Sequence, residues 1–284
     1  TNTLYEWQTD SLADAGANAQ IEGDDYTGEA RTATVRLNNQ TQISSKSVTI
    51  SGTDDAVNNA GMGTQMAYQL AKMGKELKRD MERAMVGVEN AKVAGNASTA
   101  RELGSVGTWY GGNKPGTSSA ASNFSVGGSP SASPAGTGAT AIAGGTNRTY
   151  TELLLKAGLL KAFELGGEPE TVMMSPSHKQ IASGFNGVAT KYKDATDKVS
   201  IGTTDIYVSD FGEVRVVSDR ILRSSGRTAL VCDTEMWAAA FLRPFQVQDL
   251  AKTGDAEKKQ LLVEYTLVSK NEAASGKIAD LTTS

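Results

Sequence analysis

One long run of regularly spaced apolar residues, from residue 63 to residue 90, is the clearest pattern in the chain. The apolar side chains recur every three or four residues, at Met66, Leu70, Met73, Leu77, Met81, Ala84 and Val88. Charged side chains fill the opposite face. This spacing predicts a long amphipathic helix with a buried, methionine-rich stripe. Gly74 interrupts it at a cost of about 1 kcal/mol relative to alanine, which would permit a bend or a close contact.

Upstream of this helix, residues 31–53 alternate between apolar and polar side chains, as strands do. Asn38 and Asn39 stand between two alternating runs and predict the turn of a β-hairpin. The polar face of this hairpin carries three cations, Arg31, Arg36 and Lys46. A two-stranded hairpin is only marginally stable alone in water, so we expect it to lie on another surface, with these three cations as contact candidates.

Residues 1–30 form a polar segment in which large apolar side chains are isolated from one another. They are Tyr5, Trp7, Leu12, Ile21 and Tyr26. Such a segment buries too little apolar surface to fold alone, whereas aromatic side chains are effective anchors at interfaces. The sequence therefore predicts an extended arm that docks on a neighbouring surface, with Tyr5 and Trp7 as the contact candidates.

Residues 104–149 are rich in glycine, serine and alanine and show no periodic pattern. A structureless loop of this length is rare inside a compact domain. We therefore expect a surface excursion or an extended connector. Gly136-Thr137-Gly138 completes neither of the phosphate-binding motifs GxGxxG and GxxxxGK(S/T), so no nucleotide-binding loop is expected.

Regular patterns return at residue 149. Thr149 and Glu152 have the spacing of a helix capping box, and the predicted buried face holds Leu153, Leu154, Ala157, Leu160 and Phe163. A strand is expected at residues 171–174, followed by a short helix that begins at Ser175 and Pro176. Further strands are expected near residues 205–209, 213–217, 228–232 and 260–268. This order of elements predicts a mixed α+β fold.

Composition limits the classes of function. The net charge of −4 argues against a protein that binds nucleic acid through its overall field, although it allows a container for nucleic acid. The single cysteine, Cys232, excludes an intrachain disulfide and fits a reducing compartment. No stretch approaches the roughly 18 apolar residues of a membrane span, so no membrane partner is expected.

The sequence offers little catalytic chemistry. Its one histidine, His178, is expected on a polar helix face. No GxSxG-type turn supplies a serine nucleophile for which this histidine could act as the base. With one histidine and one cysteine, a zinc site is not expected. The paired carboxylates Asp24–Asp25 and Asp54–Asp55 fit solvated turns. We expect no enzyme activity, no metal and no cofactor, and a hydrolase working through Glu22, Asp24 or Asp25 is the alternative.

Short sequence blocks from end to end resemble one family. They are residues 5–10, 21–25, 42–46, 76–82, 209–212 and 250–255. In their order, together with the arm, the strand pair, the long helix and the α+β region, they resemble the major capsid proteins of tailed bacteriophages. These share the Hong-Kong-97-type fold, and the blocks are similar to its SU-ten-like branch.

The resemblance implies a division of the chain. Residues 1–30 would be the N-terminal arm, and 31–53 the extended loop that reaches over a neighbour. Residues 54–103 would form the peripheral domain with its spine helix, and 104–149 the excursion. Residues 150–250 would be mainly the axial domain, and 251–284 would return to the peripheral domain. A precursor segment removed during maturation would suit a start at Thr1.

The resemblance also implies a function and partners. The chain would assemble with copies of itself into hexamers and pentamers of an icosahedral virion head, formed in the bacterial cytoplasm. That head would enclose double-stranded DNA without sequence-specific binding. Portal, scaffolding and decoration proteins would be further partners. The other reading of the same fold is a cellular nanocompartment shell that holds enzyme cargo.

Overall fold

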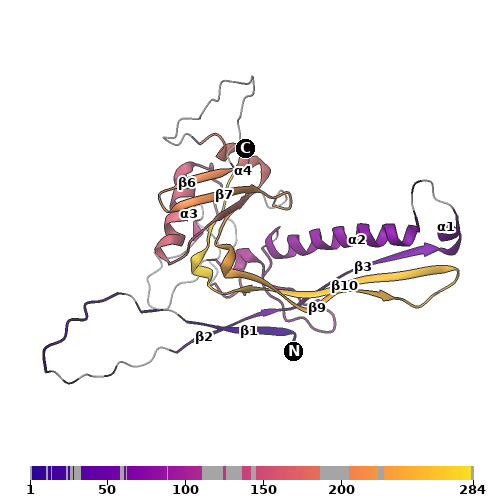
Figure 1. Cartoon of the computed structure of the whole chain (residues 1–284), viewed down its shortest axis with the longest axis horizontal. Helices are drawn as coiled ribbons and strands as arrows, with labels where there is room; N and C mark the ends of the chain where they lie inside the picture. Colours follow the sequence, from indigo (N-terminus) through magenta and orange to yellow (C-terminus); the bar gives the residue numbers. More distant parts are fainter. Residues whose placement is uncertain are drawn as a thin grey trace.

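The computed structural model describes residues 2–10, 12–13, 15–23, 25, 28, 33–57, 61, 63–87, 89–110, 124–125, 136–141, 145–185, 205–222 and 227–282. The molecule is elongated (Figure 1). A compact unit built on one sheet stands above a long platform of helix and strands. A hairpin below them sends its loop away from both.

The platform is a three-stranded antiparallel sheet with one long helix along it. Its strands lie in the order β3 (Gln42–Ser51), β10 (Ala256–Ser269) and β9 (Trp237–Asp249). After the short helix α1 (Gly52–Ala56), the helix α2 (Gln65–Glu82) runs back along the sheet and ends in a π-helical turn (Arg83–Gly87). The prediction of a long helix is confirmed, and its buried residues include Met66, Met73, Leu77 and Met81.

The core of the platform includes the first part of the segment expected at the surface. Trp109 and Tyr110 are fully buried and follow a short 3₁₀ turn (Val106–Thr108) against α2 and β10. The prediction of a surface excursion is therefore wrong for residues 104–110. The glycine-rich and serine-rich composition of this stretch indicated a loop, although two of its large aromatic side chains belong to the platform core. Residues 111–123, 126–135 and 142–144 of the same stretch lie outside the described residues.

The hairpin joins strands that are far apart in the sequence. β1 (Leu4–Thr9) pairs antiparallel with β2 (Val35–Gln40), and Trp7 lies opposite Leu37. The prediction of a hairpin within residues 31–53 is wrong, because β2 pairs with β1 while β3 pairs with β10. Asn39 does not lie in a turn. It is fully buried and bonded to backbone groups, so a polar residue that is typical of turns serves here as an internal clamp.

The compact unit contains a six-stranded mixed sheet in the order β4-β11-β8-β5-β7-β6. Its strands are β4 (Phe124–Ser125), β5 (Thr171–Met174), β6 (Ile206–Ser209), β7 (Gly212–Ser218), β8 (Ala229–Cys232) and β11 (Gly276–Ile278). The helices α3 (Glu152–Glu164) and α4 (Pro176–Ala182) pack on it. A short 3₁₀ turn at Thr234–Met236 precedes β9, and another at Glu272–Ala274 precedes β11. The predicted strands near 171–174, 205–209, 213–217, 228–232 and 260–268 are confirmed.

Helix α3 buries the face opposite to the one predicted. Its buried residues are Leu155, Gly158, Leu159 and Ala162. Leu153 is 76% exposed, and Leu160 and Phe163 are exposed as well. Apolar side chains surround much of this helix, so periodicity alone could not choose a face. The capping box is also wrong, because the N-cap is Thr151, which makes no side-chain bond to the helix.

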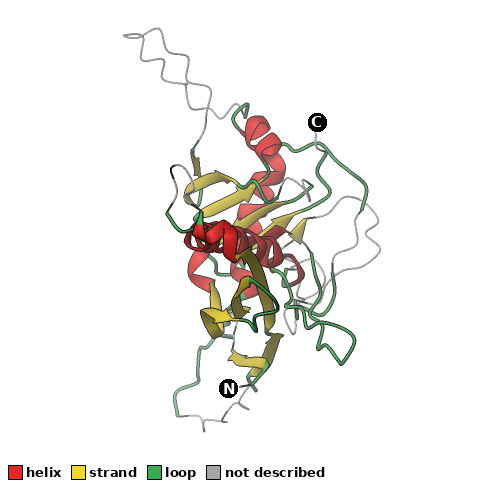
Figure 2. Cartoon of the chain, turned by 90° about the vertical axis from the view of Figure 1, so that its right-hand side faces the viewer, coloured by secondary structure: helices red, strands yellow, loops and turns green. Residues whose placement is uncertain are grey.

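The two units share strand β8. Leu230 and Cys232 contact the platform core, whereas Ala229 and Val231 contact the core of the compact unit. Figure 2 looks along the platform and shows α2 in the middle of the molecule, with strands of the compact unit above it and the hairpin below. A second link is the ion pair between fully buried Lys277 of β11 and Glu89. Burial lowers the pKa of Lys277, while Glu89 opposes this shift.

Candidate intersubunit surfaces

The base of the β1–β2 hairpin is fixed to the platform by one amide. The side chain of Asn39 accepts a hydrogen bond from the Gly104 backbone N–H at 2.8 Å and donates one to the Leu267 carbonyl at 2.7 Å. The neighbouring backbone adds a bond from the Thr41 N–H to the Thr3 carbonyl at 2.9 Å. Buried hydrogen bonds of this kind specify one geometry, because a lost partner leaves a desolvated polar group.

A buried carboxylate fixes the same region from the other side. Glu264 of β10 accepts from Arg101 at 2.7 Å, from Arg243 of β9 at 2.8 Å and from the Thr41 hydroxyl at 2.9 Å. These three donors come from the loop before Trp109, from the edge strand β9 and from the residue between β2 and β3. The base of the hairpin is therefore rigidly tied to the platform sheet.

Beyond this base, the hairpin carries exposed apolar side chains. Leu12 is 96% exposed, Ile21 is 78% exposed and Tyr5 is 43% exposed. The described residues between the two strands have no regular secondary structure. Single exposed leucines are common on proteins. Because the loop extends away from both cores, these two side chains are accessible to another molecule.

The sequence-predicted contact residues divide into two groups. Tyr5 and Arg36 lie on the hairpin surface, where Arg36 pairs across the strands with Glu6. Trp7 and Lys46 are instead partly buried. The Trp7 ring packs 5.4 Å from Trp109, so Trp7 serves as an intrachain anchor.

Lys46 lies on β3 and holds the platform sheet to α2. Its ammonium lies 3.0 Å from the carboxylate of Asp80 and 3.3 Å from that of Glu76. The hydrogen bond to Asp80 is the main cause of a raised pKa at Lys46. Arg31, the fifth candidate, lies outside the described residues.

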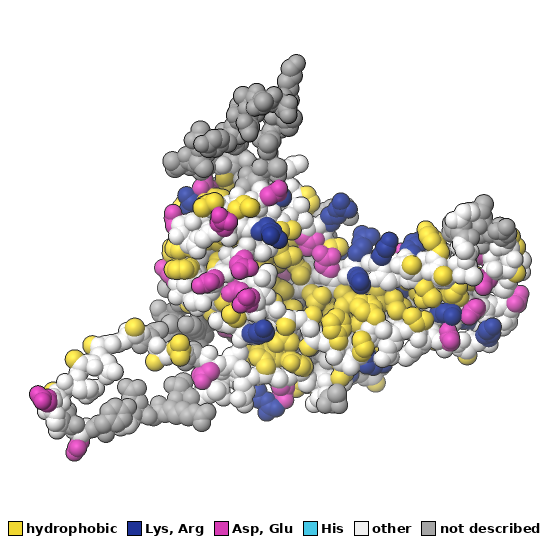
Figure 3. Space-filling view, in the orientation of Figure 1, with side chains coloured by type: hydrophobic (Ala, Val, Ile, Leu, Met, Phe, Trp, Pro, Cys, Tyr) yellow, Lys and Arg dark blue, Asp and Glu magenta, His cyan; other side chains and the backbone are white. Residues whose placement is uncertain are grey.

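Sequence reasoning missed the edge strand β9. In the described part of the chain no strand pairs with the outer side of β9, and the strand exposes Phe241, Phe245 and Val247. Apolar side chains gather over this part of the platform (Figure 3). A long edge strand with apolar side chains invites association with another chain. No strand signal is visible in the sequence here, because proline and alanine are poor strand formers and the strand contains Pro244 and three consecutive alanines, residues 238–240.

The compact unit exposes a second apolar surface. The Phe163 ring of α3 stacks on the Phe211 ring at 4.8 Å, and both rings are partly open to solvent. Leu153 and Leu160 extend the exposed side of α3.

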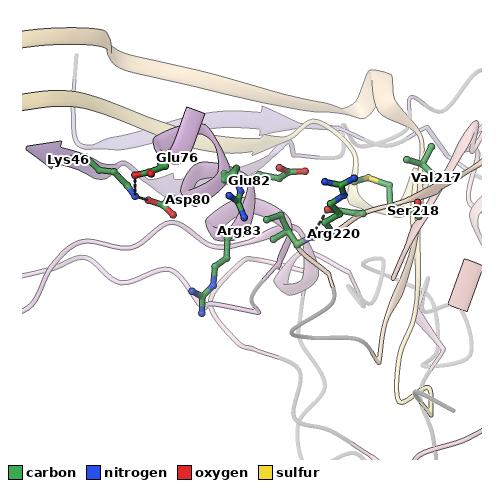
Figure 4. Close-up of a pocket in the computed structure, with 12 residues that line it drawn as sticks. Lys46, Glu76, Asp80, Glu82, Arg83, Val217, Ser218 and Arg220 are labelled. Carbon is green, nitrogen blue, oxygen red and sulfur yellow. Dashed lines mark hydrogen bonds and ion pairs between the residues drawn. The ribbon is translucent and has the colours of Figure 1, made fainter. Parts of the chain in front are cut away.

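A groove of about 1090 Å³ lies where α2 meets the end of β7 (Figure 4). Charged residues of both signs line it: Lys46, Glu76, Arg79, Asp80, Glu82, Arg83, Asp219 and Arg220. Burial raises the pKa of Glu82, and the negative charge of Asp219 adds to this while Arg79 opposes it. The mixed charge suits contact with a polar or charged partner rather than an apolar one.

The one histidine and the one cysteine of the chain are both buried. His178 is fully buried and not on an exposed helix face: Nδ1 lies 2.7 Å from the Ser175 hydroxyl and Nε2 lies 2.9 Å from the Thr282 carbonyl. Burial lowers the pKa of this imidazole. Cys232 is buried, and burial raises its pKa to about 11. Among the described residues no three potential ligands gather into a metal site, and no helix could span a membrane.

Solved structures with a similar fold include a phage capsid subunit and an encapsulin. The subunit of the Cyanophage A-1(L) capsid superposes with a TM-score of 0.65 at 12% identity, covering 99% of this chain and 88% of that one. The holo-SrpI encapsulin from Synechococcus elongatus superposes with a TM-score of 0.53 at 10% identity, covering 99% and 83%. The chain has the Hong-Kong-97-type fold.

Sequence comparison separates the two kinds of shell. The "Major capsid protein" of Escherichia phage Phieco32 is 26% identical over 303 aligned positions, covering 96% of this chain and 84% of the relative. The family model described as "SU10 major capsid protein" matches residues 1–282. The chain belongs to the SU10 major capsid protein family, and its function is that of a tailed-phage major capsid protein.

Glu22 and Asp25 of the hydrolase alternative lie in the exposed hairpin loop, and Asp24 lies outside the described residues.

Proposed function

We propose that copies of this chain form hexamers and pentamers of a closed icosahedral head around double-stranded DNA, with the β1–β2 hairpin as the clasp between neighbours. Assembly takes place in the host cytoplasm, where the buried thiol of Cys232 stays reduced. In this proposal the hairpin makes the contacts with a neighbouring subunit that were expected of two separate segments, an arm at residues 1–30 and a loop at residues 31–53.

The observation that carries the proposal is the exposure of Leu12 and Ile21 on a loop anchored at its base. The Asn39 and Glu264 contacts hold that base, so the loop is presented in one direction. The matching apolar surface is the edge strand β9 with Phe241, Phe245 and Val247. Burying a leucine or isoleucine contributes about 1.5–3 kcal/mol, and every subunit of a shell would repeat that contact.

The division into domains follows the same proposal. The platform, with α2 as its spine, is the peripheral domain, and the compact unit is the axial domain that meets its copies at capsomer centres. The exposed Phe163–Phe211 pair and Leu153 supply apolar area for that meeting. Portal, scaffolding and decoration proteins are the further partners in this proposal.

The test is a charge placed on the clasp. Subunits with both Leu12→Asp and Ile21→Asp should fold with an unchanged melting temperature, because neither side chain contributes to a core. They should not form closed shells in electron micrographs. Ala17→Asp with Ala19→Asp adds the same charge to exposed positions of the same loop and should leave assembly intact. Normal shells from the Leu12/Ile21 variant would reject the clasp.

The acceptor surface is tested separately. Val247→Asp should block assembly as the hairpin variant does, without lowering the melting temperature, because this side chain is exposed. The contents of wild-type particles distinguish the two kinds of shell. Nuclease-protected genomic DNA is expected, whereas shells that contain enzyme cargo and no DNA would mark a nanocompartment.

A further inference from the structure

A row of cations lies along the outer face of α2. The helix and its π-helical turn carry five basic residues, Lys72, Lys75, Lys78, Arg79 and Arg83, and all five are exposed. Four of them follow a spacing of three or four residues and therefore lie on one stripe. With a rise of 1.5 Å per residue, this stripe is about 16 Å long. Figure 3 shows basic side chains gathered over this edge of the platform.

The carboxylates of the helix leave most of this row unneutralised. Glu76 and Asp80 both contact Lys46 from the neighbouring strand, and Glu76 is 3.9 Å from Lys72. Glu82 lines the groove and attracts Arg79 electrostatically without forming an ion pair with it. Within the described residues, Lys75, Lys78, Arg79 and Arg83 have no carboxylate within 4.0 Å.

The row is not explained by the stability of the fold. Like charges three or four residues apart destabilise a helix by a few tenths of a kcal/mol for each pair. The chain as a whole is acidic, with a net charge of −4. A concentrated basic stripe on an acidic protein is instead typical of a surface that meets a polyanion. Arg79 and Arg83 also line the groove with Arg220, where the carboxylates of Glu82 and Asp219 lie beside them, so the basic stripe itself is confined to the helix.

We propose that this row, Lys72, Lys75, Arg79 and Arg83, contacts the phosphate backbone of the packaged double-stranded DNA, so that α2 faces the inside of the shell. The proposal rests on the proposed function, because it requires a shell that encloses DNA. Duplex DNA presents one charge for about every 1.7 Å of its axis, and a row of this length can neutralise several of them. Contacts to phosphates carry no sequence information, so any genome sequence would fit.

The first test uses unassembled full-length subunits and a fluorescent random duplex of about 30 base pairs, followed by anisotropy over about 50–200 mM KCl. Wild-type binding should weaken steeply with salt. Lys75→Glu with Arg79→Glu should lower the affinity at least about tenfold and reduce the salt slope by about two. The matched control, Lys252→Glu with Lys270→Glu, makes the same charge change at exposed residues elsewhere. Charge-preserving Lys75→Arg with Arg79→Lys should bind as the wild type does.

Equal loss in the Lys75/Arg79 variant and in the control would overturn the proposal, as would wild-type binding that does not depend on salt. The second test supplies the Lys75/Arg79 variant during infection and counts DNA-filled heads. Closed shells with fewer filled heads are expected. Shells that fill normally would overturn the role of the row and leave the proposed function standing. Wild-type subunits that never form DNA-containing shells would overturn the proposed function itself.

Discussion

The ring of Trp7 lies 5.4 Å from the ring of Trp109, centroid to centroid, and this contact joins the hairpin to the core of the platform. Trp109 is fully buried, and its indole N–H donates to the Gly104 carbonyl at 3.3 Å. Gly138 adopts a left-handed conformation, with φ of 71°, directly against the same indole. An aromatic pair of this kind fixes the hairpin where it leaves the platform and leaves its loop free to meet a neighbour.

Trp7→Ala should lower the free energy of unfolding by about 2 kcal/mol, part of the 3–5 kcal/mol typical of a fully buried tryptophan, because Trp7 is only half-buried. Urea unfolding of the unassembled subunit measures this. Tyr5→Ala, two residues away on the same strand and largely exposed, should cost less than about 1 kcal/mol. Equal effects of the two changes would show that Trp7 does not anchor the hairpin.

Gly74→Ala should raise the free energy of unfolding by roughly 0.5–1 kcal/mol, because alanine favours the helix. A Cβ at this position would meet only the Leu261 side chain, at 3.9 Å, so no clash offsets the gain. Gly167→Ala is the contrasting variant, since its Cβ would lie 2.1 Å from the Ala274 carbonyl oxygen. It should be strongly destabilising. A loss of stability in Gly74→Ala would contradict the argument from helix propensity.

Acid should weaken the contact between α4 and the end of the described chain. The pKa of His178 is below 6.5 in the folded state, chiefly because of burial, with the Thr282 carbonyl opposing the shift. Between the two pKa values the unfolded chain binds a proton that the native chain does not, so stability falls as pH drops below about 6.5. It is fully present above that pH.

The measurement is the urea midpoint at about pH 7.5 and pH 5.5. His178→Gln should be less stable at the higher pH, because it loses the ring contacts, but should change less between the two. His178 is the only histidine, so the difference between the two proteins isolates its titration from that of the carboxylates. The same pH dependence in both proteins would contradict the burial argument.

The sequence predicted those elements whose signal is local. Helix α2 was found because its stripe repeats over many turns, and β5, β7 and β8 because their runs are short and apolar. The hairpin was misplaced because the partner of β2 lies about thirty residues upstream, a distance that no local pattern records. Asn39 appeared to be a turn residue, since a buried amide and a turn amide have the same identity in a sequence.

The candidate surfaces were predicted only in part. An interface arm at residues 1–30 was predicted from its isolated aromatic residues, and Tyr5 and Arg36 lie on the surface of the β1–β2 hairpin. The roles of Trp7 and Lys46 depend on Trp109 and Asp80, which approach them only in the folded chain. The outer face of α3 could not be predicted from a helix that is apolar on both sides. Its buried side is chosen by Gly158, where a Cβ would lie 3.2 Å from the Ile278 side chain.

Strand β8 has a mechanical consequence for a closed shell. Its alternate residues belong to two different cores, and the Lys277–Glu89 ion pair bridges the same junction. No flexible tether therefore separates the compact unit from the platform along this path. A force applied to the compact unit would therefore be transmitted to the platform through β8. Outward pressure on such a wall would be carried within each subunit by packed side chains and by this ion pair.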